Sequence, residues 1–135
     1  MKIVINSCYG GFSISQKCAE YLAERGSKTA IKELEEWNKR KEWMNYYLKN
    51  GEFPKDAVGT DFLKIEAKYK KEPQFYGHDY DRYDQDLVRA VEELGEAASG
   101  KYAKLKVIEI PDGIEWEIDD YDGIESIQEK HRSWS

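Results

Sequence analysis

The sequence is poor in the residues that mark several large classes of protein. It has only two cysteines, Cys8 and Cys18, which are too few for a disulfide framework, so both are expected to be reduced thiols. No apolar run is long enough to cross a bilayer, and the N-terminus lacks the basic start and apolar core of a signal peptide. We therefore expect a cytoplasmic protein that makes no membrane contact.

Patterns of catalytic and metal-binding residues are also scarce. Residues 118–129 resemble a calcium-binding loop in part, but Ile118 stands where the first carboxylate ligand belongs. Cys8 lies near a predicted helix start, where a thiolate is favoured, and only His78 and His131 could serve as its base. A small buried thiol explains Cys8 better, so no catalytic residue, no metal and no cofactor is expected.

Basic residues are missing between Val107 and Glu129, a stretch that is rich in Asp and Glu. The whole chain has a formal net charge of −6, and this stretch alone holds nine acidic residues, so the charge is unevenly distributed. An acidic surface repels phosphate backbones, so direct binding of nucleic acid is not expected. A protein partner with a basic cleft is the alternative, and the candidate contacts are Glu115, Glu117, Asp119, Asp120 and Asp122.

What the sequence does contain indicates one folded domain. A length of 135 residues allows a real core but leaves no room for a second domain. Aromatic residues make up 13% of the chain, and large rings bury area efficiently, so disorder is not expected despite the high charge.

The chain opens with a strand, a glycine turn and a helix. The apolar run in residues 2–6 predicts an interior strand that is covered on both faces. Gly10 and Gly11 predict a turn, and Ser13 or Ser15 can cap a helix that runs to about Arg25.

Three further helices are predicted in the middle of the chain. The first starts at Ser27 or Thr29 and runs to about Asn50, and a shorter one covers residues 61–70. Residues 27–72 together are interpreted as a charged helical insertion or arm. After a ring-rich loop over residues 74–83, an amphipathic helix is capped by Asp84 or Asp86 and closed by Gly100.

The last third of the chain predicts two strands and a helix. Residues 105–110 form an apolar run, and residues 114–120 alternate strictly between apolar and acidic side chains, so the two are expected to pair as a hairpin. Residues 124–134 are expected to form a final helix. The fold class is therefore α+β, a small sheet of the N-terminal strand and a C-terminal β-hairpin packed with several helices.

The glycine turn is the candidate for a bound anion. A strand, a glycine turn and a helix start often hold a phosphate, because free amides and the helix dipole point into the turn. Rings of the 74–83 loop, including Phe75 and Tyr76, can stack a base, and Arg82 or Arg132 can pair with a phosphate. The candidate ligand-binding residues are Tyr9, Gly10, Gly11, Phe12, Ser13, Tyr80, Arg82, Tyr83 and Arg132.

Two blocks of the sequence resemble a known group. The opening MKIVINSCYGGFSIS and the distant segments DQDLVRAVEELGEAASG and LKVIEIPDGIEWEIDDYDGIESIQEKHRSW are similar to a family of small phage and prophage proteins of uncharacterised activity. The resemblance covers roughly residues 1–25 and 74–134, whereas residues 27–72 depart from it. It implies a phage or prophage origin, and phage accessory proteins of this size often act against host defences.

Three functions are therefore expected, in this order. The first is a non-enzymatic phage accessory protein that sequesters a nucleotide-like small molecule. The second is a protein inhibitor whose acidic face imitates nucleic acid and blocks a host defence nuclease. The third is a small nucleotide-processing enzyme that uses Cys8 or carboxylates such as Glu93 and Glu96. Exposed rings in residues 27–83 also make a homo-oligomer one of the expectations.

Overall fold

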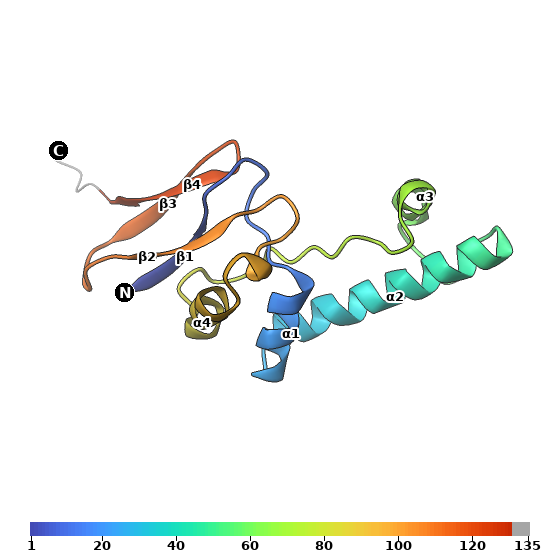
Figure 1. Cartoon of the computed structure of the whole chain (residues 1–135), viewed down its shortest axis with the longest axis horizontal. Helices are drawn as coiled ribbons and strands as arrows, with labels where there is room; N and C mark the ends of the chain where they lie inside the picture. Colours follow the sequence, from blue (N-terminus) through green and yellow to red (C-terminus); the bar gives the residue numbers. More distant parts are fainter. Residues whose placement is uncertain (131–135) are drawn as a thin grey trace.

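The structure is a computed structural model that describes residues 1–130. Among these residues it has four α-helices, one 3-10 turn and two antiparallel strand pairs (Figure 1). The predicted α+β class is confirmed. Arg132 and the end of the predicted last helix lie outside the described residues.

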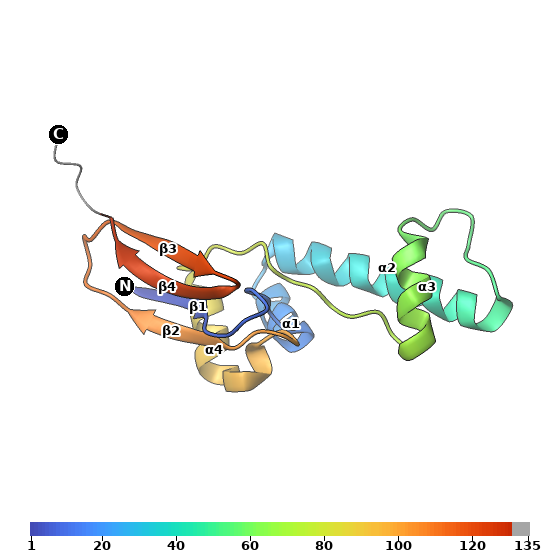
Figure 2. The same cartoon turned by 90° about the horizontal axis from the view of Figure 1, so that it is seen from above.

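The folded body has three layers. The central layer is β1 (Lys2–Asn6) paired antiparallel with β2 (Leu105–Glu109). Helix α4 (Gln85–Leu94) covers one face, and a hairpin of β3 (Trp116–Tyr121) and β4 (Ile124–Glu129) lies over the other (Figures 1 and 2). Strand β1 is thus enclosed on both sides, as its continuous apolar run predicted.

The side chains of β1 alternate between these two layers. Val4 is fully buried in the main core, with residues of α1 and α4. Ile3 and Ile5 point to the opposite face, towards the hairpin, and are 0% and 3% exposed. The free edge of β1 is closed as well, because the Val4 amide donates to the Arg82 carbonyl at 2.7 Å.

The predicted hairpin between residues 105–110 and 114–120 is wrong. Strand β2 pairs with β1, with Val4 opposite Val107, and β3 pairs with β4 instead. The observed pairing differs from the predicted one because β2 is apolar enough to lie in the central layer. Strand β3 has one exposed acidic face, so it lies in the outer layer. Pro111 and Gly113 therefore connect two layers and do not close a hairpin.

The predicted helix over residues 124–134 is also wrong in its described part. Asp122 and Gly123 both have positive φ angles, 49° and 90°, which is the signature of the two-residue turn that joins strands tightly. That turn sends the chain straight back along β3, so residues 124–129 form β4. The spacing of Ile124 and Ile127 is typical of a helix, but the turn chemistry decides the structure.

The first two helices start where the sequence predicted. Helix α1 (Gln16–Glu24) is capped by Ser15, whose hydroxyl accepts from the Cys18 amide at 3.1 Å. Helix α2 (Lys28–Asn50) is capped by Ser27 in the same way. Gly51, in the left-handed conformation, ends α2 as a C-terminal cap.

Helix α2 and the following α3 (Thr60–Tyr69) extend from the body (Figure 2). The first half of α2 packs on α1, and its second half carries α3 away from the sheets. With 23 residues, α2 is about 35 Å long. We call the second half of α2 together with α3 the arm.

The arm has a small core of its own, which includes Met44 and Leu63, 0% and 1% exposed. Arg40 on α2 pairs with the buried Glu66 carboxylate on α3 at 2.9 Å. The indole of Trp37 donates to the Pro73 carbonyl at 2.8 Å. These contacts fix α3 and the chain that follows it to α2.

The helix predicted after the ring-rich loop is present, and it starts at one of the two predicted caps. Asp84 caps α4 by accepting from the Leu87 amide at 3.0 Å. The α-helix ends at Leu94, however, and a 3-10 turn over residues 95–98 follows. Gly100 lies close against Ser13, so it serves packing and does not end the helix.

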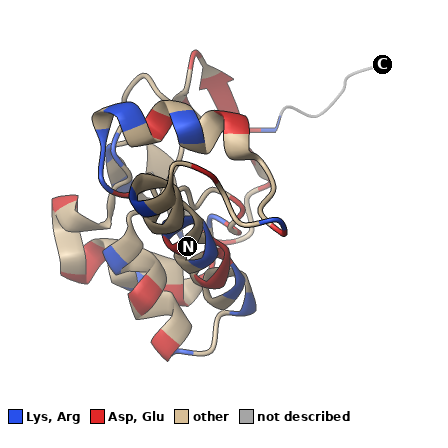
Figure 3. Cartoon of the chain, turned by 90° about the vertical axis from the view of Figure 1, so that its right-hand side faces the viewer, with Lys and Arg blue, Asp and Glu red and all other residues tan. Residues whose placement is uncertain are grey.

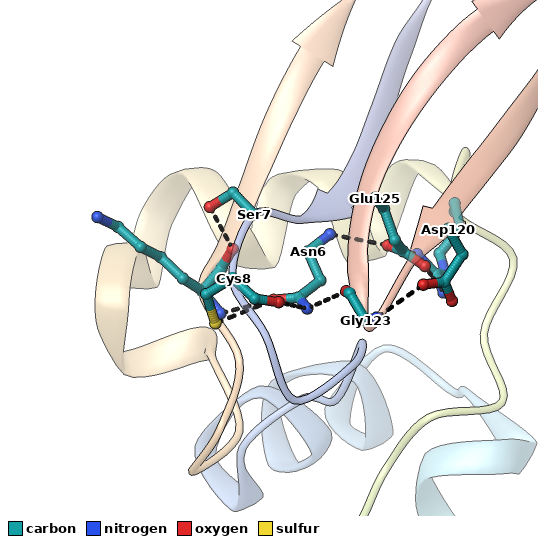
Figure 4. A network of polar contacts seen from close by, with 8 residues as sticks. Asn6, Ser7, Cys8, Asp120, Gly123 and Glu125 are labelled. Atoms are coloured by element: carbon teal, nitrogen blue, oxygen red, sulfur yellow. Dashed lines mark hydrogen bonds and ion pairs between the residues drawn. The ribbon is translucent and has the colours of Figure 1, made fainter.

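The hairpin is fastened to β1 at its turn by backbone packing and a polar network (Figure 4). A Cβ on Gly123 would overlap the amide nitrogen of Gly11 and would lie 2.8 Å from the amide nitrogen of Gly10. The Asn6 side chain, fully buried, donates to the carbonyls of Gly123 and Cys8 and accepts from the Lys104 amide. We call the region formed by Asn6, Cys8, Gly10, Gly11, Lys104 and Gly123 the glycine junction.

Replacing Gly123 with alanine tests the junction against a matched turn glycine. Gly113 also has a positive φ, 82°, but a Cβ there would meet open space, so Gly113→Ala should cost only the backbone strain of about 1–2 kcal/mol. Gly123→Ala should cost about 1–3 kcal/mol more, because the added carbon meets backbone. Urea unfolding of both variants measures the difference, and equal losses would contradict the packing role of Gly123.

Candidate functional site

The predicted anion notch at Gly10 and Gly11 is closed on one side by the protein's own backbone. The backbone of Gly123 lies against both amides, and a Cβ on Gly10 would overlap the Tyr102 carbonyl oxygen. Close backbone packing therefore accounts for Gly10 and Gly123, whereas Gly11 is favoured by its positive φ of 84° and a Cβ there would meet open space. The Gly123 side of the turn has no room for a phosphate. The neighbouring Ser13 lies against Gly100, whose amide donates to the Ser13 carbonyl at 3.0 Å.

Arg82 was predicted to face a phosphate, but the structure pairs it with a carboxylate. Its guanidinium donates through both terminal nitrogens to Glu125 on β4, with Nη2 to Oε2 at 2.9 Å. It also stacks 3.5 Å from the centre of the Phe12 ring. Since the Glu125 charge neutralises Arg82, these residues hold the hairpin against the body.

The predicted tyrosines lie in separate environments. Tyr80 is half-buried, and its hydroxyl donates to Glu33 on α2. Tyr83 lies edge-on to Trp116 at the hairpin, with 6.1 Å between ring centroids. Tyr9 is 66% exposed beside the glycine junction. Among the predicted residues that the structure describes, Phe12 and Arg82 meet, whereas Tyr9, Tyr80 and Tyr83 lie apart in separate environments.

Cys8 belongs to the same structural region. Its thiol donates to the Tyr102 carbonyl oxygen at 3.2 Å, so it is part of the glycine junction's network. Burial raises the pKa of the other thiol, Cys18, to about 12, which keeps that thiol protonated. Both cysteines are free, as expected.

The acidic residues of the hairpin form an outer face, with one exception. Trp116 and Ile118 face the body and are half-buried, so the alternating Glu117 and Asp119 face solvent. Asp120 lies opposite Glu125 and therefore points to the inner side, where it accepts from the Gly123 amide. We call the predicted set without Asp120 the acidic face: Glu115, Glu117, Asp119 and Asp122.

A pocket that the sequence did not predict lies where α2 leaves the body. It has a volume of about 460 Å³, within the range of small-molecule sites. Its walls are the first half of α2 and the start of the ring-rich loop. The lining residues are Thr29, Lys32, Glu33, Glu36, Trp37, Arg40, Phe75, Tyr76, His78 and Asp79. We call it the α2 pocket.

Aromatic rings form one part of the α2 pocket. Trp37 and Phe75 meet edge to face, with centroids 5.9 Å apart, and Trp37 is 7% exposed. Tyr76 is 43% exposed, so its ring is accessible at the pocket. Phe75 and Tyr76, both predicted to stack a base, line this pocket.

Charged groups form the other part. Burial raises the pKa of the Glu33 carboxyl, although hydrogen bonds from Tyr80 and the His78 backbone oppose the shift. Burial and the nearby Glu33 in turn raise the pKa of the Tyr80 hydroxyl. Lys32 and Arg40 supply positive charge to the lining, and Arg40 also bonds Glu66.

The residues of α2 that line the pocket were missed because their spacing also fits an ordinary helix. Lys32, Glu33, Glu36 and Arg40 recur at intervals of three and four, which is typical of any exposed helix face. The available signal was Trp37 on that same face, since a large ring there requires a partner. The partner is Phe75, 38 positions later by residue number, which the sequence does not indicate.

Comparisons with known proteins add no assignment. No family model, no curated protein and no solved structure matches the chain. Within residues 1–130, no cluster of three or more His, Cys, Asp or Glu side chains is arranged to hold a metal ion. The helices of the same described part are all too short or too polar to span a membrane.

The raised pKa of Glu33 predicts a pH-dependent effect of Glu33→Gln. The folded state favours the protonated carboxyl, so stability falls as the pH rises above the ordinary value of 4.5, and glutamine escapes this loss. We expect the variant to gain stability relative to the native chain between pH 4 and pH 7, measured as urea midpoints. Glu36→Gln, exposed on the same helix, is the control. If the urea midpoints of Glu33→Gln and the native chain differ by the same amount at pH 4 and at pH 7, the burial effect on Glu33 is contradicted.

Proposed function

We propose that the protein is a non-enzymatic binding protein that sequesters a nucleotide-like small molecule in the α2 pocket. The single observation that carries this proposal is the chemistry of the lining, which combines rings, a half-buried carboxylate and cations in about 460 Å³. Each of these groups matches one part of a nucleotide. The glycine turn is not included, because the Gly123 backbone lies against both of its amides.

The match can be followed part by part. The accessible ring of Tyr76 offers a stacking surface for a base, an interaction worth about 1–3 kcal/mol. Glu33 and Asp79 can accept from sugar hydroxyls, as carboxylates do in dinucleotide sites. Lys32 can pair with a phosphate, and Arg40 adds positive charge to the lining while it holds Glu66. A lining of mixed charge therefore suits a nucleotide better than an inorganic anion.

The resemblance to phage and prophage proteins gives this binding a context. A protein that removes a nucleotide signal needs affinity and abundance but no turnover. Sequestration of a host signalling nucleotide would be a counter-defence activity, and it is consistent with the resemblance noted for residues 1–25 and 74–134.

Thermal unfolding against a panel of linear, cyclic and dinucleotide ligands tests the proposal. A ligand at 100 times its Kd stabilises a protein by about 2.7 kcal/mol, which corresponds to a rise in Tm on the order of 10 °C. Tyr76→Ala should weaken binding about 5- to 150-fold through the lost stacking. Lys32→Ala should weaken it most at low salt.

Exposed residues far from the pocket provide matched controls. Tyr121→Ala removes a ring that is 72% exposed on the hairpin, and Lys49→Ala removes an exposed cation near the end of α2. Both should leave the Tm shift unchanged. If no nucleotide raises the Tm, or if the pocket and control variants bind equally well, the proposal fails.

A second candidate function is inhibition of a basic partner by the acidic face. The specific observation is that the structure, over residues 1–130, gives Glu115, Glu117, Asp119 and Asp122 no ion pair. Alternate strand residues lie about 6.8 Å apart, twice the 3.4 Å axial rise per phosphate along one DNA strand. Unpaired carboxylates at this spacing can imitate a phosphate backbone at a basic cleft, as in a host defence nuclease.

Neutralising the acidic face separates this candidate from the first. The variant E115Q/E117Q/D119N/D122N should lose salt-sensitive capture of nucleic-acid-binding proteins from a bacterial lysate, and duplex DNA should compete for the same proteins. A variant with Glu20, Glu24, Glu35 and Glu42 changed to glutamine is the control for net charge, since all four are exposed. Equal capture by both variants would contradict a role for the acidic face.

A further inference from the structure

An apolar stripe on α3 has no partner within the described chain. Phe62, Ile65 and Tyr69 follow each other at helical spacing and are 50%, 55% and 82% exposed. Val58, just before the helix, is 71% exposed. The other side of α3 is already in use, since Leu63 and Glu66 are buried against α2.

The stripe continues into a groove between α2 and α3. This groove has a volume of about 530 Å³ and includes Trp43, Val58 and Phe62 in its lining. Exposed aromatic and aliphatic side chains beside a groove are typical of protein interfaces, where Trp, Tyr and Phe supply most of the binding energy. The feature therefore fits a protein partner.

The charges around the stripe indicate which partner. Asp61 lies in the first turn of α3 and Lys68 in its last turn, with Lys70 and Lys71 directly after the helix. The flanking Lys55-Asp56 pair is neutral, and Glu72 offsets one of the lysines after the helix. Figure 3 looks at the arm end of the molecule, where both kinds of charge lie on the helices. A complementary surface must therefore carry basic groups at one end and acidic groups at the other. An antiparallel copy of α3 carries this distribution.

We infer that the arm is a dimerisation element, in which the α3 stripes of two copies pack antiparallel about a two-fold axis. The axis passes beside Ile65, so Ile65 meets its own counterpart, and Phe62 of each copy meets Tyr69 of the other. Asp61 of each copy then lies beside Lys68 and Lys70 of the other. Such an isologous contact is closed, so it yields a dimer and no filament.

The size of the surface is consistent with this contact. A fully exposed aromatic side chain offers about 150–250 Å², and the stripe holds two aromatic and two aliphatic side chains with half or more of their surface exposed. Two such stripes with their charged rims reach on the order of 1,000 Å², the lower bound for a specific interface. A dimer that dissociates in the micromolar range is the expected outcome.

Sedimentation equilibrium of the full chain tests this inference directly. The native protein should approach twice the 15.8 kDa chain mass as its concentration rises. Ile65→Asp puts a charge on the two-fold axis and should raise the dimer Kd tenfold or more. Tyr121→Asp, at a residue 72% exposed on the hairpin, is the matched control and should leave the Kd unchanged.

A charge-swap mixture tests the antiparallel arrangement. Asp61→Lys alone and a K68D/K70D variant alone should each dimerise more weakly, because like charges then meet across the contact. Mixing the two variants should restore a heterodimer, since every contact is again between opposite charges. Two misfolded variants would not form a heterodimer when mixed. Recovery in the mixture therefore shows that both variants are folded and that the loss in each alone comes from charge repulsion.

Each result bears on the inference. Dimerisation that Ile65→Asp weakens and the mixture restores would support it. A monomer at every concentration, a dimer insensitive to Ile65→Asp, or a dimer lost in Tyr121→Asp would overturn it. The nucleotide proposal is unaffected in all of these cases, because the α2 pocket does not include Val58, Phe62, Ile65 or Tyr69.

Discussion

The ion pair between Arg82 and Glu125 is the interaction on which the rest of the body depends. Glu125 is 7% exposed and takes bonds from both terminal nitrogens of Arg82 and from the Asn6 amide, so one carboxylate joins the ring-rich loop, β1 and the hairpin. Removing one partner of a buried pair typically costs about 3–5 kcal/mol, because the remaining charge stays buried and unpaired. These three segments are far apart in sequence, and the pair fixes how they meet.

This constraint also decides where a ligand can bind. Arg82 stacks on Phe12 and pairs with Glu125, and the Gly123 backbone lies against the amides of Gly10 and Gly11, so the guanidinium predicted to bind a phosphate is already paired and one side of the glycine turn is occupied. The loop that carries Arg82 begins at the α2 pocket, however, and Tyr80 ties it to Glu33 on α2. Residues that appear in sequence as one candidate site are thus divided, with structural contacts at one end of the loop and accessible rings at the other.

The sequence predicted the local structure well and the long-range pairing poorly. Ser15, Ser27 and Asp84 act as helix caps because a cap is decided by neighbours three residues away. The partner of β2 depends on contacts across the chain, which no local pattern contains. Residues 124–129 form a strand because the local Asp122-Gly123 turn reverses the chain, a signal that the helical spacing of Ile124 and Ile127 obscured. The charges of Arg82 and Glu125 were visible, but nothing in the sequence shows that they neutralise each other across 43 positions.

The arm and the α2 pocket are linked through one side chain. Arg40 lines both the pocket and the groove beside α3, and its bond to Glu66 holds α3 on α2. Glu66 also accepts from the Gln74 amide, at the start of the loop that supplies Phe75 and Tyr76. The Glu66 carboxylate therefore both holds α3 on α2 and positions the start of the loop that forms one wall of the α2 pocket. Packing of a second copy on α3 acts on this same carboxylate. Because linkage is reciprocal, any effect of a second copy on ligand affinity must equal the effect of the ligand on self-association.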